Sequence, residues 1–340
     1  MRIERIEVGL PTSLISNADV FELLNANSKK LPSSMQEEIE SFFDASGAVQ
    51  RFWRATDREP QHVLQEAAAR MFRHIDRRDI KIVIYCSASK YFAEPAHASI
   101  FCGINNVAPE YAFDISDGCM GWLTSLNIIE KFCLNKQEGY ALIISHEFPM
   151  GRNGAVYPKC FNISSHTQLK YKLPALTLGE ACTLTLVKMD APSTQCIRVE
   201  LPSGAELCTV PYRNYNNFLW NSSFIFDEEE FHAHYNEMSK VAALKSISIL
   251  NKSLKGKRIN LVPHSYTRSF EKLSDLLSFH PKIVNYFGEY GNTATSSIPL
   301  NIEIARRRGA LDHSRPTYAW CASAGIKVCI AELKLNLSIN

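Results

Sequence analysis

The sequence predicts an α/β protein in which helices cover both faces of a central sheet. Residues 80–86 form an apolar run rich in Ile, which is typical of a strand buried on both faces. Helical spacing of apolar residues follows at 96–107, and a short strand at 112–115 leads into a helix that runs from Cys119 to about residue 135. A further core strand is expected at 140–145. Strands that alternate with helices across short connections indicate an α/β unit.

The remaining residues of the first half fit the same class. Residues 1–12 are expected to form a half-buried strand, with helices at 17–25, 35–43 and 61–75. The periodicity is lost at 149–176, which predicts a loop or hairpin excursion, and a strand returns at 178–187. Asp, Pro and Ser residues at 189–194 are typical of a junction. We therefore expect two halves, residues 1–189 and residues 190–340.

The second half repeats the order of strand, loop, helix and strand. Strands are expected at 196–201, before His264, at 283–287, at 318–321 and at 327–335, and helices at 227–250, 269–278 and 298–308. Four acidic residues, 227–230, open the long helix, where they suit the positive end of the helix dipole. An aromatic stretch at 212–226 is expected to line a pocket.

Composition excludes several classes of protein. The formal net charge of +2 over 340 residues argues against a general nucleic-acid-binding protein, which needs a strong basic excess. The N-terminal residues alternate charged and apolar side chains, unlike a signal peptide. No stretch approaches the roughly 20 apolar residues of a membrane span. We therefore expect a cytoplasmic protein that binds neither nucleic acid nor a membrane.

The cysteine pattern favours reduced thiols over disulfides or a metal site. Ten cysteines are scattered singly, many of them inside apolar runs, and no Cys-x-x-Cys pair occurs. His232 and His234 have no companion at a metal-ligand spacing, so they are interpreted as part of a helix surface and no metal is expected.

Cys119 is the leading candidate for a nucleophile. Because it lies at the first turn of a predicted helix, unpaired N–H groups and the helix dipole are expected to lower the pKa of its thiol. Gly118 and Gly121 on either side leave room for a substrate or another backbone. A buried, inert cysteine in a glycine-containing turn is the alternative interpretation of this segment taken alone.

Three segments, in this order, resemble the β-ketoacyl-acyl-carrier-protein synthase III family of condensing enzymes. They are Asp114-Ile115-Ser116-Asp117-Gly118-Cys119, Val262-Pro263-His264 and Tyr290-Gly291-Asn292-Thr293. The resemblance identifies Cys119, His264 and Asn292 as catalytic residues. It also implies a thiolase-like fold, with two halves related by a pseudo-twofold axis in a duplicated five-layer αβαβα architecture.

The resemblance implies a two-step reaction. Cys119 would take an acyl group from a thioester, with the backbone N–H groups of Cys119 and Ala324 as the oxyanion hole. A malonyl-type or β-ketoacyl thioester would then undergo decarboxylative Claisen condensation with that acyl group, with His264 and Asn292 donating hydrogen bonds to the enolate. The substrates would be carried on coenzyme A or phosphopantetheine, and no other cofactor is expected.

Further residues are candidates for carrier or coenzyme A binding. Trp53 and Arg54 occupy the region that the family uses near the entrance of the pantetheine arm, where they could stack on a nucleotide and pair with a phosphate. Arg268 and Lys272 could contact an acidic acyl carrier protein. Ordinary surface side chains are the alternative interpretation of all four. The family resemblance also implies a homodimer.

The chain departs from the family pattern at two places. Ser265-Tyr266-Thr267 follows His264 where the family has Gln-Ala-Asn, and Ser323-Ala324-Gly325 replaces a triple glycine. These departures favour a specialised enzyme of secondary metabolism. Two other functions stay open: an acyltransferase of the same fold that acts on an alcohol or amine, and a non-catalytic subunit of a heteromeric condensing enzyme.

Overall fold

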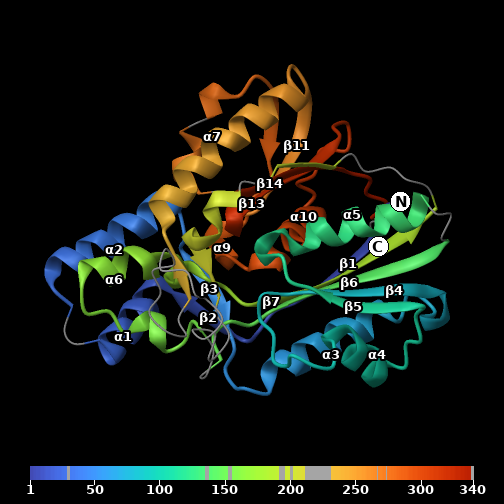
Figure 1. Cartoon of the computed structure of the whole chain (residues 1–340), viewed down its shortest axis with the longest axis horizontal. Helices are drawn as coiled ribbons and strands as arrows, with labels where there is room; N and C mark the ends of the chain where they lie inside the picture. The colour runs from blue at the N-terminus through green and yellow to red at the C-terminus, as the bar shows by residue number, and fades with distance from the viewer. Residues whose placement is uncertain are drawn as a thin grey trace.

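Two five-stranded sheets, stacked with helices between them and on their outer faces, form the body of the molecule (Figure 1). The structure is a computed structural model that describes residues 1–28, 31–134, 138–151, 155–190, 196–199, 202–210, 231–265, 267–272 and 274–337. Across these ranges, no helix combines the length and the apolar character that a membrane span requires.

The first sheet is built from strands between residues 2 and 189. Its order is β1 (Arg2–Gly9), β7 (Ala181–Met189), β6 (Gly139–Glu147), β4 (Ile80–Cys86) and β5 (Tyr111–Ile115). The pairs β1/β7 and β7/β6 are antiparallel, whereas β6/β4 and β4/β5 are parallel. The loops after β4 and β5 therefore leave the same edge of the sheet.

The second sheet repeats this topology. Its order is β8 (Cys196–Val199), β14 (Lys327–Leu333), β13 (Thr317–Ser323), β11 (Arg258–Pro263) and β12 (His280–Ile283). Here too the first two pairs are antiparallel and the last two are parallel. Because both order and strand direction match position by position, the predicted duplication is confirmed. The division of the chain at 189/190 into separate folding units stays a prediction.

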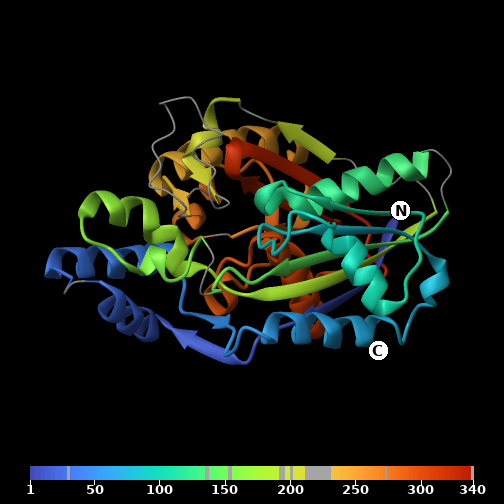
Figure 2. The ribbon, with the colours of Figure 1, turned by 60° about the horizontal axis from the view of Figure 1, so that its bottom comes forward.

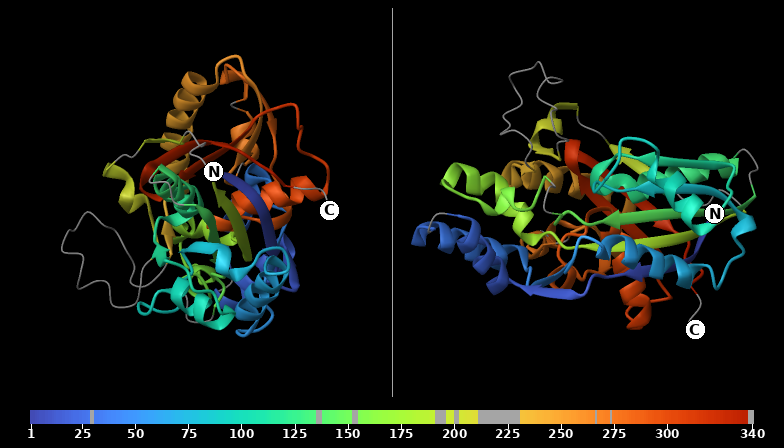
Figure 3. Two further views of the ribbon diagram at one scale, coloured as in Figure 1. Left: turned by 90° about the vertical axis from the view of Figure 1, so that its right-hand side faces the viewer. Right: turned by 90° about the horizontal axis from the view of Figure 1, so that it is seen from below.

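Helices complete five layers. The middle layer holds α5 (Gly121–Leu134) and α10 (Ser297–Arg307), and its apolar core includes residues of both sheets. On the outer face of the first sheet lie α3 (Glu59–Met71) and α4 (His97–Asn105), and α7 (Tyr235–Leu254) covers the outer face of the second. Figure 3 shows the same stacking from two further directions. The predicted αβαβα architecture is confirmed.

A lobe of mostly helical structure extends from one end of the layers (Figure 2). It contains α1 (Asn17–Asn27), α2 (Ser33–Ser46), α6 (His166–Lys172) and the small sheet of β2 (Ser13–Ser16) and β3 (Gln50–Trp53), around one apolar core. The prediction of a loop or hairpin at 149–176 is wrong in its described part. That segment forms α6 between 3₁₀ turns at 159–161 and 173–177, because Leu169, Leu173 and Leu176 pack into the core of the lobe.

Two helices of the second half differ from the prediction. The long helix begins at Tyr235 because His232–Ala233 form β10, which pairs with β9 (Cys208–Thr209), and the side chain of His234 accepts the N–H of Glu237 as an N-cap. His232 stacks on Tyr171 at 4.1 Å between ring centroids, so the pair does not form a helix surface. Residues 227–230 and the aromatic stretch 212–226 lie outside the described residues. The helix expected at 269–278 is divided into α8 (Arg268–Glu271) and a 3₁₀ turn at 274–276.

The cysteines are free thiols wherever their side chains are described. Seven of them are buried: Cys86, Cys102, Cys133, Cys160, Cys182, Cys321 and Cys329. Cys119 and Cys208 are partly exposed. The expectation of reduced core cysteines therefore holds for the described side chains.

A backbone junction joins the two halves next to α9 (Phe287–Tyr290). The Asn292 N–H donates to the Thr177 carbonyl at 2.8 Å, and the Gly179 N–H donates to the Asn292 carbonyl at 3.0 Å. A Cβ on Gly179 would lie 2.0 Å from the Tyr290 carbonyl oxygen, and one on Gly291, whose φ is +68°, would lie 2.4 Å from the Thr177 carbonyl oxygen. Because glycine has no side chain, the backbone segments 177–179 and 290–292 can approach each other closely.

We expect Gly179→Ala to lower the free energy of unfolding by about 2–3 kcal/mol, because the added methyl group collides with backbone that cannot move without breaking the junction. Gly103→Ala is the matched control. Its added Cβ meets no atom within 4 Å, and in the helix α4 alanine should add about 0.5–1 kcal/mol of stability. Urea unfolding of both variants measures the difference. If both variants had the same free energy of unfolding, the backbone at the junction would be able to move aside for a methyl group.

Candidate active site

Cys119 lies in a tight turn that connects β5 to α5. Residues Gly118–Met120 form one 3₁₀ turn, and α5 continues from Gly121. Gly118 has a φ of +49°, a conformation that residues with a Cβ rarely adopt. Met120 is fully buried, whereas Cys119 remains partly exposed. The sequence prediction that Cys119 lies at the start of a helix is confirmed.

Asn292 occupies the equivalent connection of the second half, between β12 and α10. The 3₁₀ turn Ala294–Ser296 precedes α10 as Gly118–Met120 precedes α5, and the two turns pack against each other. A Cβ on Gly121 would lie 3.1 Å both from Cβ of Cys86 and from Cγ2 of Thr295, so the two helix beginnings are in close contact. The duplicated fold thereby brings the Cys119 turn next to the loop that carries Asn292.

The carboxamide of Asn292 is held in one orientation. Its Oδ1 accepts the N–H of Ala294 at 2.9 Å, while its backbone N–H and carbonyl are fixed by the junction with residues 177–179. With the amide oxygen occupied, the NH₂ group is the part left to donate hydrogen bonds. The arrangement suits stabilisation of a negative oxygen.

His264 directly follows β11 and is 8% exposed. Its backbone N–H donates to the carbonyl of Trp320 on β13 at 2.8 Å, and its Nε2 lies 3.3 Å from the hydroxyl of Ser265. Burial lowers the pKa of the imidazole to about 4, against the opposing effect of a hydrogen bond with the Asn292 side chain. At neutral pH, His264 is therefore a neutral imidazole with one donor and one acceptor nitrogen.

The end of β13 closes the site opposite Cys119. Oγ of Ser323 and Cβ of Ala324 lie 3.1 Å and 3.7 Å from the position that a Cβ on Gly118 would take. The chain turns there with positive φ at Gly325 (+72°) and Ile326 (+48°). The structure thus brings Cys119 together with Ser323 and Ala324, and His264 together with Asn292, around the packed turns 118–120 and 294–296.

The expectation of a lowered pKa for Cys119 is wrong. Burial raises the pKa of the thiol, and the nearby Cys208 and Glu147 raise it further, because a thiolate beside them would be poorly solvated and repelled. The backbone N–H of Cys119 and the hydroxyl of Ser323 oppose this effect only in part. In this structure, burial outweighs the helix N-terminus, and the thiol keeps its proton at neutral pH.

An ion pair joins the turns on either side of the site. The Nζ of Lys327, just past the 324–326 turn, contacts Oδ1 of Asp117, and Oδ2 of Asp117 accepts the hydroxyl of Thr124 at 2.5 Å. Sequence reasoning did not identify Lys327, which lies 210 positions from its partner. The signal available in the sequence was the position of Lys327, four residues after Ser323 and therefore close to the predicted oxyanion-hole segment.

Glu147 is a second residue that sequence reasoning missed. Its side chain is 2% exposed and accepts the hydroxyl of Thr295 at 2.5 Å and the N–H groups of Ala88 and Ser89 at 3.0 Å and 3.1 Å. The carboxylate thereby ties the 294–296 turn to the loop after β4. The sequence places Glu147 just after a predicted core strand. The loops at that edge of the sheet commonly carry functional residues, so this position could have identified it.

Trp53 and Arg54 do not fit the predicted binding role. Trp53 is 7% exposed, donates its indole N–H to the Leu178 carbonyl at 2.8 Å, and packs edge-on against Phe161. Nε of Arg54 pairs with Oε1 of Glu180 at 3.0 Å, inside the protein. Trp53 lies on the buried face of β3, whereas the guanidinium of Arg54 is kept from solvent by its pairing with the buried Glu180. The alternative of an amphipathic segment is compatible with the alternating burial along β3.

Arg268 and Lys272 lie on the surface, at the start of α8 and directly after its end. The side chain of Arg268 covers Gly47 at the end of α2, with its Cγ 2.9 Å from the position of an added Cβ. The helix α8 begins four residues after His264 and packs against α2. The role of Arg268 and Lys272 in binding stays a prediction.

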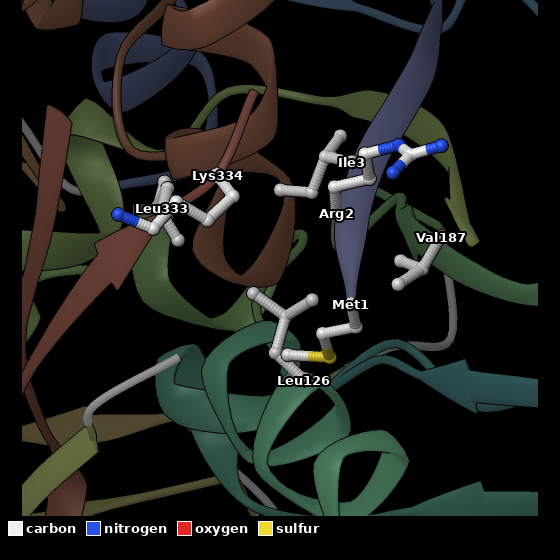
Figure 4. Close-up of a pocket in the computed structure, with 7 residues that line it drawn as sticks. All are labelled: Met1, Arg2, Ile3, Leu126, Val187, Leu333 and Lys334. Carbon is white, nitrogen blue, oxygen red and sulfur yellow. The ribbon is translucent and has the colours of Figure 1, made fainter. Parts of the chain in front are cut away.

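Two hollows lie away from these residues. A space of about 10 Å³, no larger than a single water needs, lies between the N-terminal strand, α5 and β14. Figure 4 shows the side chains that line it. A surface groove of about 380 Å³ runs along residues 311–317 and 332–337. The described side chains contain no cluster of three or more His, Cys, Asp or Glu that could hold a metal ion.

Comparisons with known proteins agree with the resemblance. The chain is 23% identical to β-ketoacyl-[acyl-carrier-protein] synthase III of Ehrlichia ruminantium over 98% of this chain and 99% of that protein. It is 23% identical to the synthase of the same name from Baumannia cicadellinicola, over 89% of each chain. No family model matches the sequence.

Solved structures show that the fold is thiolase-like, as predicted. Cerulenin-bound OleA of Xanthomonas campestris superposes with a TM-score of 0.76 at 17% identity, covering 97% of this chain and 96% of that one. The 3-oxoacyl-[acyl-carrier-protein] synthase III of Aquifex aeolicus gives a TM-score of 0.70 at 17% identity, with 98% and 99% covered. The predicted resemblance to the synthase III family is therefore confirmed, at the distance expected of a divergent relative.

Acidification should destabilise the protein through His264. Because its pKa falls from 6.5 to about 4 on folding, the unfolded state binds more protons between these pH values. About 3 kcal/mol of stability, complete above pH 6.5, should be lost progressively toward pH 4. Urea unfolding across this range should therefore be less pH-dependent for His264→Asn. His62→Asn, at an exposed position on α3, should keep the wild-type slope. Identical slopes for all three proteins would refute a buried neutral imidazole.

Proposed function

We propose that this chain is a condensing enzyme related to β-ketoacyl-acyl-carrier-protein synthase III. It forms an acyl-enzyme at Cys119 and joins that acyl group to a second thioester by decarboxylative Claisen condensation. The observation that carries the proposal is the packing of the Cys119 turn against the turn after Asn292, with the Ser323–Ala324 turn opposite. The side chain of Asn292 is also near enough to His264 to influence the pKa of its imidazole.

In the first step, the sulfur of Cys119 attacks the carbonyl carbon of an acyl thioester. The tetrahedral oxyanion accepts hydrogen bonds from the backbone N–H groups of Cys119 and Ala324. The bond to the leaving sulfur then breaks, and the proton of the Cys119 thiol ends on the released thiol. Because the pKa of the Cys119 thiol is raised, the proton has to leave as the sulfur attacks, and it passes to the sulfur of the departing thiol.

In the second step, the carboxylate of a malonyl-type thioester leaves as carbon dioxide, and its electron pair forms an enolate. Neutral His264 donates one hydrogen bond to the enolate oxygen and the NH₂ group of Asn292 donates another, each worth roughly 3 kcal/mol in a dry site. The enolate carbon attacks the acyl carbonyl carbon, and the Cys119 sulfur leaves with the electron pair of the carbon–sulfur bond. Proton uptake restores the thiol.

The protonation state of His264 favours this chemistry over acyl transfer to an alcohol or amine. An imidazole whose pKa is about 4 is a weak base for activating a hydroxyl group, whereas its N–H donor is useful for an enolate. The amide of Asn292 cannot raise the basicity of the imidazole as a carboxylate would. The acyltransferase and the non-catalytic subunit remain the alternatives that experiment must exclude.

The proposal also covers the substrates, the cofactor requirement, the location and the oligomeric state. The substrates are acyl groups on coenzyme A or on an acyl carrier protein, no further cofactor takes part, and the enzyme is a cytoplasmic homodimer. The residues after His264 and the serine at position 323 support a specialised role in a secondary-metabolite pathway, since both change the surroundings of the reacting groups.

Mass spectrometry of the intact protein tests the two steps separately. With an acyl-CoA panel, the wild type should gain the mass of one acyl group on Cys119, and Cys119→Ala should gain none. Cys102→Ala is the matched control, because Cys102 lies on α4 at the outer face of the first sheet, away from the Cys119 turn, and its replacement should leave acylation intact. Asn292→Ala should be acylated but release carbon dioxide from malonyl thioester about 100-fold to 1,000-fold more slowly. Absence of acylation across the panel would contradict the proposal, and acylation without carbon dioxide release would favour the acyltransferase.

Charge reversal tests the docking of a carrier protein. Arg268→Glu should raise the KM for a carrier-bound substrate by about fivefold, since attraction to an acidic carrier becomes repulsion, and should leave the KM for the coenzyme A form nearly unchanged. Arg73→Glu is the control, two residues past the end of α3, which lies well away from α2 and its neighbour α8 (Figure 1). An unchanged KM for Arg268→Glu would remove this residue from the docking surface.

A further inference from the structure

We infer that Ser323 is a positioning residue, whose hydroxyl donates a hydrogen bond to the Cys119 sulfur and stabilises its thiolate. The inference deepens the proposed function, because it assigns the group that assists ionisation of the nucleophile. It concerns a position where this chain has a side chain and the resembled family has glycine.

The backbone fixes the Ser323 side chain against the Cys119 turn. Ser323 is the last residue of β13, is 4% exposed and pairs in register with Lys327 on β14. Its Oγ lies 3.1 Å from the position that a Cβ on Gly118 would take. The ion pair between Asp117 and Lys327 joins the same two turns and keeps residue 323 beside the Cys119 turn.

The Ser323 hydroxyl has no well-aligned hydrogen-bond partner within the described part of the chain. Its approach to the Cys119 sulfur is close enough to lower the pKa of that thiol, but lacks good hydrogen-bond alignment with the neutral thiol. A buried hydroxyl without a partner is costly, at about 1–3 kcal/mol, and calls for an explanation. A thiolate, which accepts hydrogen bonds from many directions, would complete the pairing once the proton leaves.

The groups around Cys119 make this one donor important. Glu147 at the end of β6, Cys208 on β9, and Cys321 on β13 face the thiol, and Asp117 precedes it with its charge paired to Lys327. Cys208 and Glu147 disfavour the thiolate. Two donors favour the thiolate of Cys119: the hydroxyl of Ser323 and the backbone N–H of Cys119 itself. Among the side chains that the structure describes around Cys119, the paired Lys327 is the cation.

The rate of iodoacetamide alkylation of Cys119, followed against pH by peptide mass spectrometry, tests the inference without any substrate. At each pH below the midpoint of the profile, alkylation of Cys119 in Ser323→Ala should be about tenfold slower than in the wild type. Ser323→Thr restores the hydroxyl and should return the profile toward the wild type.

Thr183→Val is the matched control. Oγ1 of Thr183 is also a buried hydroxyl without a partner in the described structure, but it lies on β7, and its removal should leave the profile unchanged. Circular dichroism checks the folding of each variant. Should Ser323→Ala not fold, Ser323→Gly serves instead, since it carries the residue of the resembled family.

Each outcome decides the inference. A profile of Ser323→Ala that matches the wild type overturns it, as does a Ser323→Thr variant that behaves like Ser323→Ala, or a Thr183→Val variant shifted to the same extent. The proposed function fails separately: a shifted profile in a protein that accepts no acyl group would keep the contact between Ser323 and Cys119 and reject the condensing reaction.

Discussion

The close contact between the beginnings of α5 and α10 is the constraint on which the site depends. Both helices lie in the middle layer, and the approach of Gly121 to Thr295 leaves little space for a side chain at position 121. Because the two halves share one topology, the loop that enters each helix emerges at the same edge of its sheet. Packing the two halves face to face therefore brings the turn with Cys119 against the loop with Asn292.

The same packing sets the electrostatics of the reacting groups. A site between two sheets is poor in water, so the neutral forms of the Cys119 thiol and the His264 imidazole are favoured, by a raised pKa in one case and a lowered pKa in the other. Neutral groups cost little to bury, and they keep hydrogen-bond donors available for negative charge that develops only during the reaction. The charged groups nearby, Asp117, Lys327 and Glu147, are bound to partners and hold the turns in place.

The backbone plan of the resembled synthases is kept although most of the side chains differ. The fold matches solved structures over 97% of the chain at 17% identity. The junction of residues 177–179 with residues 290–292 needs glycine at two positions and keeps it at both. At position 323, by contrast, a hydroxyl faces the nucleophile. The backbone tolerates a serine at position 323, because residue 323 takes no part in the contact between the beginnings of α5 and α10.

The sequence by itself determined the α/β class, most helix and strand positions, and the order of the segments that carry Cys119, His264 and Asn292, because apolar periodicity and short motifs are local properties. Only the tertiary structure decided which distant groups meet. It paired Asp117 with Lys327, buried Trp53 and Arg54 inside the lobe, and reversed the expected direction of the pKa shift at Cys119. Burial and long-range pairing depend on how the layers stack. A local pattern of residues therefore does not show which side chains lose contact with water when the chain folds.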